Sequence, residues 1–210
     1  MMSFKQKTLF AAVASASALL AAGSANAVYV NNDGLGQALV YPYYTVRAGN
    51  TTLLSVVNTT DNAKAVKVRF LDGKNTAEVL DFNLFLSPKD VWTGAIMATA
   101  DGAMIATKDK SCTNPKIPAA GQPFRNFQFT VDGDATALQA MDRVREGYVE
   151  ILEMATIPAG TDLGKDVTHV NGTPKCTLTT DAKATAAGTG VTAPSGGLFG
   201  SESIVNFTSG

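Results

Sequence analysis

The stretch from Thr51 to Met97 constrains the fold most, because it reads as a series of short alternating segments separated by turns. Between residues 65 and 70, apolar side chains alternate with Ala, Lys and Arg. Between residues 79 and 86, one face carries Leu80, Phe82, Leu84 and Leu86. A period of two is typical of a β-strand with one face on a core. We therefore expect these four residues to face the interior together with Val66, Val68 and Phe70.

Turn residues punctuate the same stretch near positions 49, 60, 73, 88 and 101, about 11 to 15 residues apart. This rhythm is slightly looser than that of typical sandwiches and barrels, but it favours the same class. The apolar, β-branched run 52–58 predicts a strand buried on both faces. Further strands are expected at 39–46, 91–97, 103–108, 124–131, 148–154 and 203–208. Pro42 restricts the first of these to a sheet edge or a bulge.

One short helix is expected before Gly147, because Leu138, Met141 and Val144 recur at helical spacing after a capping Asp134. From residue 156 to residue 200 the composition changes to Gly, Ala, Thr and Pro. This segment is predicted to be a long loop or partly disordered excursion. The sequence thus predicts a mostly β fold, an antiparallel sandwich with one helix and one long loop.

The first 27 residues have the pattern of a secretory signal peptide. Lys5 and Lys7 precede an apolar run, and Ala25-Asn26-Ala27 is an A-x-A cleavage signal. The apolar run is too short to span a bilayer, and no other segment approaches that length. Cleavage would leave a single domain, residues 28–210, exported to the periplasm, the cell surface or the extracellular space.

The mature chain would have 183 of the 210 residues and a net charge of −3. Its 15 basic residues, counted after the loss of two lysines, face 18 acidic ones. Nucleic-acid binding needs clustered Lys and Arg, so this class of partner is disfavoured. Binding to anionic lipid is disfavoured for the same reason. Two cysteines in an exported chain, Cys112 and Cys176, predict one disulfide that tethers the excursion.

Motifs for chemistry are sparse. The single histidine, His169, has no cysteine or acidic cluster at metal-ligand spacing, and no G-x-S-x-G elbow, P-loop, H-E-x-x-H or C-x-x-C occurs. Glu146, Glu150 and Glu153 are interpreted as solvent-facing residues of a strand rather than as a glycosidase pair. We therefore predict no catalytic, cofactor-binding or metal-binding residues and no enzymatic activity.

Three tyrosines near the start of the mature chain, Tyr41, Tyr43 and Tyr44, allow two interpretations. They could stack on a sugar or another small ligand. More often such residues pack with the ring half-buried and the hydroxyl in water. The sequence leaves both alternatives open.

The segments LVYPYYTVRAGNTTLLSVVNTT, KAVKVRFLDGKN and EVLDFNLFLSPKDVWTGAI resemble the N-terminal region of a group of uncharacterised secreted or cell-surface proteins of Gram-negative bacteria. The likeness covers roughly residues 35–112 and includes no catalytic signature. It implies an envelope or extracellular protein with an immunoglobulin-like fold and no known reaction. Members of the group continue beyond a glycine-rich stretch like Ser195–Gly200, which leaves open whether this chain is a fragment.

The leading expectation is a non-catalytic exported protein with a structural, adhesive or assembly role. A carbohydrate- or small-ligand-binding module is the alternative, and a hydrolase is third. Partners would be other envelope or surface proteins, or further copies of the chain joined through an edge strand. The segment 203–208 is expected to pair with its own sandwich rather than with a neighbour's edge.

Overall fold

The computed structural model describes residues 31–132, 140–180 and 190–207. By its internal contacts the chain divides into two units, Met1–Asn32 and Asp33–Gly210. Almost all of the first unit, including the predicted signal peptide, lies outside the described residues. The second unit contains every helix and strand described below. No helix among the described residues is long and apolar enough to cross a membrane.

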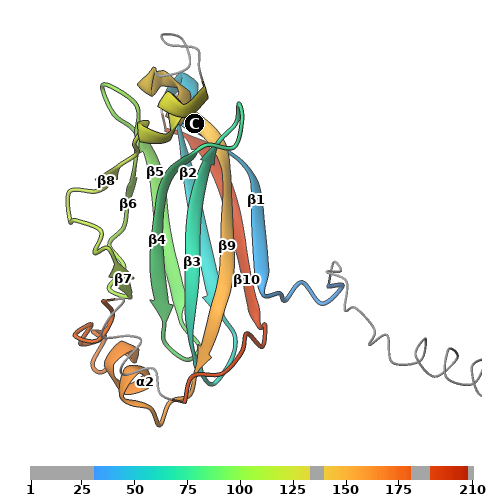
Figure 1. Ribbon diagram of the computed structural model, residues 1–210, viewed down its shortest axis with the longest axis vertical. Coiled ribbons are helices and arrows are strands. Elements are labelled where there is room, and N and C mark those ends of the chain that lie inside the picture. Colours follow the sequence, from blue (N-terminus) through green and yellow to red (C-terminus); the bar gives the residue numbers. More distant parts are fainter. Residues whose placement is uncertain (1–30, 133–139, 181–189, 208–210) are drawn as a thin grey trace, which may run out of the picture. The chain divides into compact units, whose positions relative to one another are not determined.

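Two five-stranded antiparallel sheets pack face to face as a β-sandwich (Figure 1). One sheet has the order β1-β9-β3-β4-β7, and the other has the order β10-β2-β5-β6-β8. The strands of the first are β1 (Ala38–Thr45), β9 (Glu146–Ile157), β3 (Ala63–Asp72), β4 (Glu78–Leu86) and β7 (Cys112–Asn114). Those of the second are β10 (Leu198–Asn206), β2 (Asn50–Asn58), β5 (Val91–Ala98), β6 (Ala103–Ala106) and β8 (Gln122–Pro123). A 3₁₀ turn, η1 (Arg47–Gly49), joins β1 to β2.

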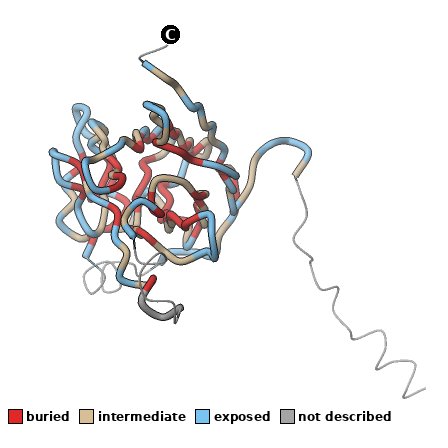
Figure 2. Tube along the Cα trace, turned by 90° about the horizontal axis from the view of Figure 1, so that it is seen from above, coloured by how far each residue is buried: buried red, intermediate tan, exposed pale blue. Residues whose placement is uncertain are grey.

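The core lies between the two sheets, and the alternating residues supply it (Figure 2). The first sheet contributes the predicted residues Val66, Val68, Phe70, Phe82, Leu84 and Leu86, all 2% exposed or less. Leu80 packs against the same core but is only half-buried. The register of β3 on β4 shifts between Phe70 and Leu71, and Val79, which the alternation placed outward, is fully buried. From β5, Trp92 fills the opposite side.

Strand β2 differs from its prediction. Leu54 and Val56 are buried, whereas Leu53 is 39% exposed. The strand therefore buries one face, not two. Its outer face is uncovered because no described element packs over this part of the second sheet, so β-branched composition alone overestimated its burial.

Residues 124–131 do not form the expected strand. They overlap the 3₁₀ helix η2 (Phe127–Asp132), which follows the short β8. Phe124 and Phe129 are both buried, and Phe127 between them is exposed. This order of buried and exposed rings does not alternate as in a strand. The chain turns here, and the Phe129 N–H donates a hydrogen bond to the Asn126 carbonyl at 3.0 Å. The expected helix before Gly147 falls partly outside the described residues, and its described part, η3 (Met141–Arg145), is 3₁₀.

The excursion after β9 contains the α-helix α2 (Asp162–Val167), which was not predicted from the sequence. Thr161 caps it by accepting a hydrogen bond from Gly164 N at 3.0 Å. The predicted disulfide between Cys112 and Cys176 is present and joins β7 to this segment. A second apolar cluster forms where the excursion covers the outer face of the first sheet; it comprises Ala63, Ala65, Phe85, Cys112, Ile157, Leu163 and Val167.

At the opposite edge of the sandwich, β1 and β10 lie close together (Figure 1). As expected, β10 pairs with a strand of its own chain, β2, from Leu198–Asn58 to Asn206–Asn50. It begins five residues earlier than predicted. The bulge expected near Pro42 is present as a register shift between Tyr41 and Tyr44. The Tyr41 hydroxyl crosses to the second sheet and donates to the Ser55 carbonyl at 2.7 Å. It passes so close to Gly200 that a Cβ there would lie 1.9 Å from the hydroxyl oxygen.

Candidate functional site

A buried ion pair closes one end of the core. Lys64 of β3 and Glu153 of β9 both point inward, and neither side chain has exposed surface. Lys64 Nζ donates to Glu153 Oε1 at 2.7 Å, to Thr156 Oγ1 at 2.9 Å and to Ser195 Oγ at 2.7 Å. The three donor positions of the ammonium group are thereby satisfied. Glu153 was predicted to face solvent, and that prediction is wrong.

Hydrogen bonds hold Glu153 in its charged form. Burial raises the pKa of this carboxyl, but hydrogen bonds from Lys64 and from the backbone N–H groups of Ser195 and Gly196 outweigh it and lower the pKa below the ordinary value. The two backbone donors lie 3.1 Å from Oε1 and 2.7 Å from Oε2. Glu153 therefore both pairs with Lys64 and holds Ser195 and Gly196, in the segment that leads from the excursion into β10.

The only histidine makes a second connection between the excursion and the sandwich. His169 Nδ1 lies 2.5 Å from Ser87 Oγ and 3.6 Å from Asp90 Oδ2. Ser87 Oγ also accepts the His169 backbone N–H at 3.0 Å and donates to the Val167 carbonyl at 3.0 Å. Ser87 follows β4, and the histidine follows α2. The hydroxyl thus bonds both the backbone and the ring of the segment after α2.

These three residues have the composition of a hydrolytic triad but not its geometry. In a Ser-His-Asp triad the serine and the carboxylate bind opposite ring nitrogens, so that the free nitrogen can take the serine proton. Here Ser87 and Asp90 both face Nδ1. Ser87 is also only 4% exposed. The arrangement fits a structural clasp.

A second buried pair lies at the end of the sandwich that carries η3. Arg143 Nε donates to Asp72 Oδ2 at 2.5 Å, and its guanidinium stacks 4.0 Å from the Phe129 ring centre. Burial raises the pKa of Asp72, but hydrogen bonds from Arg143 and from the backbone of Lys74 and Ala77 lower it overall. This pair holds η2 and η3 against the hairpin between β3 and β4.

The three tyrosines do not form a common surface. Tyr41 and Tyr44 are 4% and 0% exposed, and only Tyr43 presents its ring, at 46%. Tyr44 donates to the Val144 carbonyl at 3.2 Å, and Tyr43 donates to Glu146 Oε2 at 3.1 Å. Burial raises the pKa of both Tyr41 and Tyr44. A stacking platform of three rings is therefore ruled out, and packing is the role of two of them.

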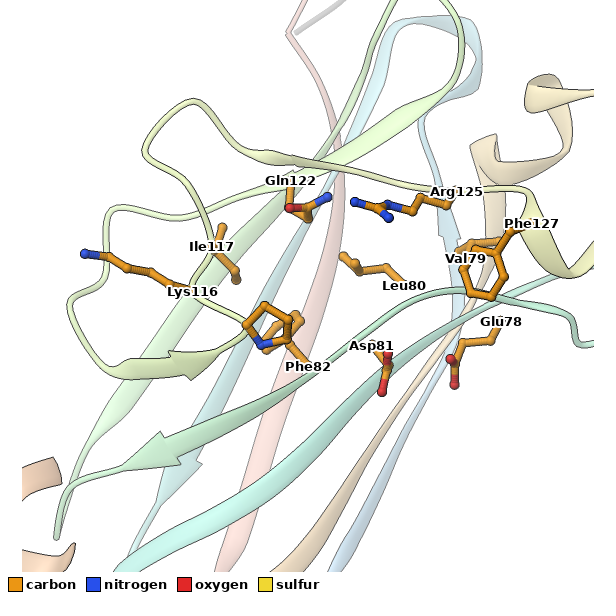
Figure 3. Close-up of a pocket in the computed structure, with 11 residues that line it drawn as sticks. Glu78, Val79, Leu80, Asp81, Phe82, Lys116, Ile117, Gln122, Arg125 and Phe127 are labelled. Atoms are coloured by element: carbon orange, nitrogen blue, oxygen red, sulfur yellow. The ribbon is translucent and has the colours of Figure 1, made fainter. Parts of the chain in front are cut away.

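A groove of about 290 Å³ opens where the two sheets part beside β4 (Figure 3). Its floor is apolar and consists of Leu80, Phe82 and Ile117. Gln122 of β8 and Arg125, which follows it, form the opposite wall, and their side chains point toward one another above Leu80. Neither wall residue was singled out from the sequence. A basic residue after a strand is too common to signal a site.

At the groove, the acidic residues form ion pairs, whereas the basic residues have no acidic partner among the described residues. Asp81 and Glu78 line it, but Asp81 bonds Lys67, and Glu78 lies 3.1 Å from Arg69. Lys116 and Arg125 are exposed and have no acidic partner among the described residues. The unpaired charge at the groove is therefore positive, although the chain as a whole is acidic.

Within the described ranges, no three His, Cys, Asp or Glu side chains cluster as a metal ion would require. Compared with known proteins, the chain matches no family model, no curated protein and no solved structure. Its function is therefore inferred from its own residues.

Proposed function

We propose that this protein is an exported, non-catalytic domain of the bacterial envelope or extracellular space, and that it acts through its surface. The observation that carries this proposal is that the side chains most able to do chemistry hold parts of the fold together. The disulfide, the clasp of Ser87 with His169, and the ion pair of Lys64 with Glu153 all attach the excursion to the sandwich. The groups best suited to chemistry are thus committed to structure.

Three features support export. The first 27 residues have a signal-peptide pattern. The paired cysteines fit an oxidising compartment, because disulfides persist outside the reducing cytosol. The resemblance of residues 35–112 to secreted proteins points in the same direction.

The test is expression of the full chain in a Gram-negative host, followed by fractionation and intact-mass measurement. We expect envelope or medium fractions to contain protein that begins at Val28 and carries the disulfide. Protein found in the cytosol with residues 1–27 retained would contradict the export proposal. A screen for ester, peptide and glycoside hydrolysis should find no turnover. Activity that Ser87→Ala and His169→Ala both abolish would establish a hydrolase instead.

The alternative, a ligand-binding module, is favoured by one specific observation. The groove beside β4 combines an apolar floor with cations that lack an acidic partner among the described residues. Ligand pockets typically pair an apolar lining with a few placed polar groups. A glycan array would test the carbohydrate version of this alternative. Tyr43, the single exposed ring among the three tyrosines, does not line this groove, so a sugar bound there would not stack on it.

A further inference from the structure

The edge of β4 is only partly covered. Strand β7 pairs with β4 at Asn83, Leu84 and Phe85 and then ends. The next backbone contact on this edge is the Arg125 N–H, which donates to the Val79 carbonyl at 2.8 Å. Between these two contacts, no described strand lies beside Leu80–Phe82. This gap in the ladder is bordered by the groove.

We propose that the groove binds an extended acidic peptide segment of a partner protein, which adds as a strand to β4 at Leu80–Phe82. An uncovered strand edge is a ready template for a further strand, and its main-chain groups provide the affinity. The inference deepens the proposed function, and rests on it, by naming the surface used and the class of partner.

The charge of the groove selects the chemistry of that segment. Arg125 points across the apolar floor, and its guanidinium has no carboxylate partner among the described residues (Figure 3). Lys116, exposed at the rim, is a second cation without an acidic partner in the described part of the chain. The two acidic residues of the groove are already held by Lys67 and Arg69 on the neighbouring strand. A segment that alternates apolar and acidic residues would place the first on the floor and the second against Arg125.

The experiment uses the disulfide-bonded protein, labelled with ¹⁵N, and a capped hexapeptide of alternating Val and Glu as the probe. Amide shifts at Leu80, Asp81, Phe82 and Arg125 should saturate together. Arg125→Glu and the milder Arg125→Gln should both weaken binding, the first by about tenfold or more. Lys175→Glu removes an exposed cation away from the groove and should leave binding unchanged.

Two further peptides make the test decisive. A peptide with Lys in place of Glu should not bind, because its charge opposes Arg125. A peptide with Pro at the central positions should not bind, because proline cannot donate to a ladder. Absence of saturation with the Glu peptide, equal binding of either control peptide, or an equal loss in Lys175→Glu would overturn the proposal. None of these outcomes alters leader cleavage or the hydrolase screen, so failure here is distinguishable from failure of the proposed function.

Discussion

Lys64 and Glu153 form a 2.7 Å ion pair in which neither side chain reaches solvent. A buried pair of this kind adds little net stability compared with apolar residues, because desolvation opposes the attraction. Removal of one partner is strongly destabilising, because the other charge then stays buried without its partner. The pair is therefore a point of vulnerability at the end of the core, where the excursion returns to the sheet.

We predict that Glu153→Gln lowers the free energy of unfolding by about 3 to 5 kcal/mol, because Lys64 is left charged and buried. Asp61→Asn is the matched control. Its pair with Lys89 is exposed, so its loss should cost about 0 to 1 kcal/mol. Urea titration measures both variants. Replacement of the pair by Lys64→Met with Glu153→Leu should recover only part of the loss, because the Ser195 and Gly196 N–H groups then lose their acceptor. Equal effects of Glu153→Gln and Asp61→Asn would contradict the buried pair.

The same pair predicts a loss of stability in acid. The pKa of Glu153 is lower in the folded protein than its ordinary value of 4.5. The stabilisation is therefore complete above that value and is lost as the pH falls below it toward the folded pKa. Asp72 contributes in the same direction from its lowered pKa. Unfolding measured between neutral and acidic pH should show a flatter slope in Glu153→Gln than in the unmodified chain; identical slopes would remove Glu153 from the explanation.

The crossing of Tyr41 over Gly200 predicts that Gly200→Ala is destabilising. A Cβ at this position would meet the Tyr41 hydroxyl and, at 2.3 Å, the Ser55 carbonyl. Both must shift, at a cost of about 1 to 3 kcal/mol. Gly160→Ala is the control, because nothing lies within 4 Å of its Cβ position. Thermal melts should separate the two, and a Gly200→Ala melt equal to that of Gly160→Ala would disprove the close approach.

The structure and the alternation pattern place Phe85 differently. On the pattern alone it faces solvent, whereas in the structure it is 3% exposed beneath α2 and the disulfide. Phe85→Ala should therefore cost about 3 to 5 kcal/mol, as should Phe82→Ala on the core face. Asn83→Ala, between them, should cost much less. Denaturant unfolding gives all three values. A small effect at Phe85 would mean that the excursion does not cover this face.

Removal of the disulfide should weaken the same region. Cys112→Ser with Cys176→Ser opens a loop with a sequence separation of 64. The chain-entropy model gives a loss of about 4 kcal/mol for a loop of this size. Peptide mapping without reduction should find the linked pair in the unmodified protein, and free thiols there would refute the assignment. Melting with and without a reductant should reproduce the difference between the two chains.

The alternation of apolar and polar residues predicted most strands, because it indicates which face of a strand packs on the core. Pro42 marked the edge strand, and the pair of cysteines marked the disulfide. The same pattern failed for Phe85 and Glu153, because segments far away in sequence cover them. For Leu53 it was the apolar composition of the strand that misled, because no described element covers the outer face there.

The helix α2 left a signal that was not used. Thr161 is a good cap, and Leu163 and Val167 are four residues apart, which places them on one helix face. The surrounding Gly-, Ala- and Thr-rich composition obscured it. The groove left no comparable signal. Its floor and wall come from two sheets, and its exposed strand edge depends on where β7 stops.

Strand order has a consequence for how such a chain acquires its structure during synthesis. Leu198 lies opposite Asn58, 140 positions earlier in the sequence, and β9 enters between β1 and β3. The strands made first are therefore not one another's final neighbours. Until β9 and β10 emerge, β1, β2 and β3 each present a side that only a distant segment can fill. Such distant pairings are formed slowly and leave strand edges open in the interval. A nascent chain of this kind depends on being kept apart from its neighbours until Leu198–Asn206 is free to join.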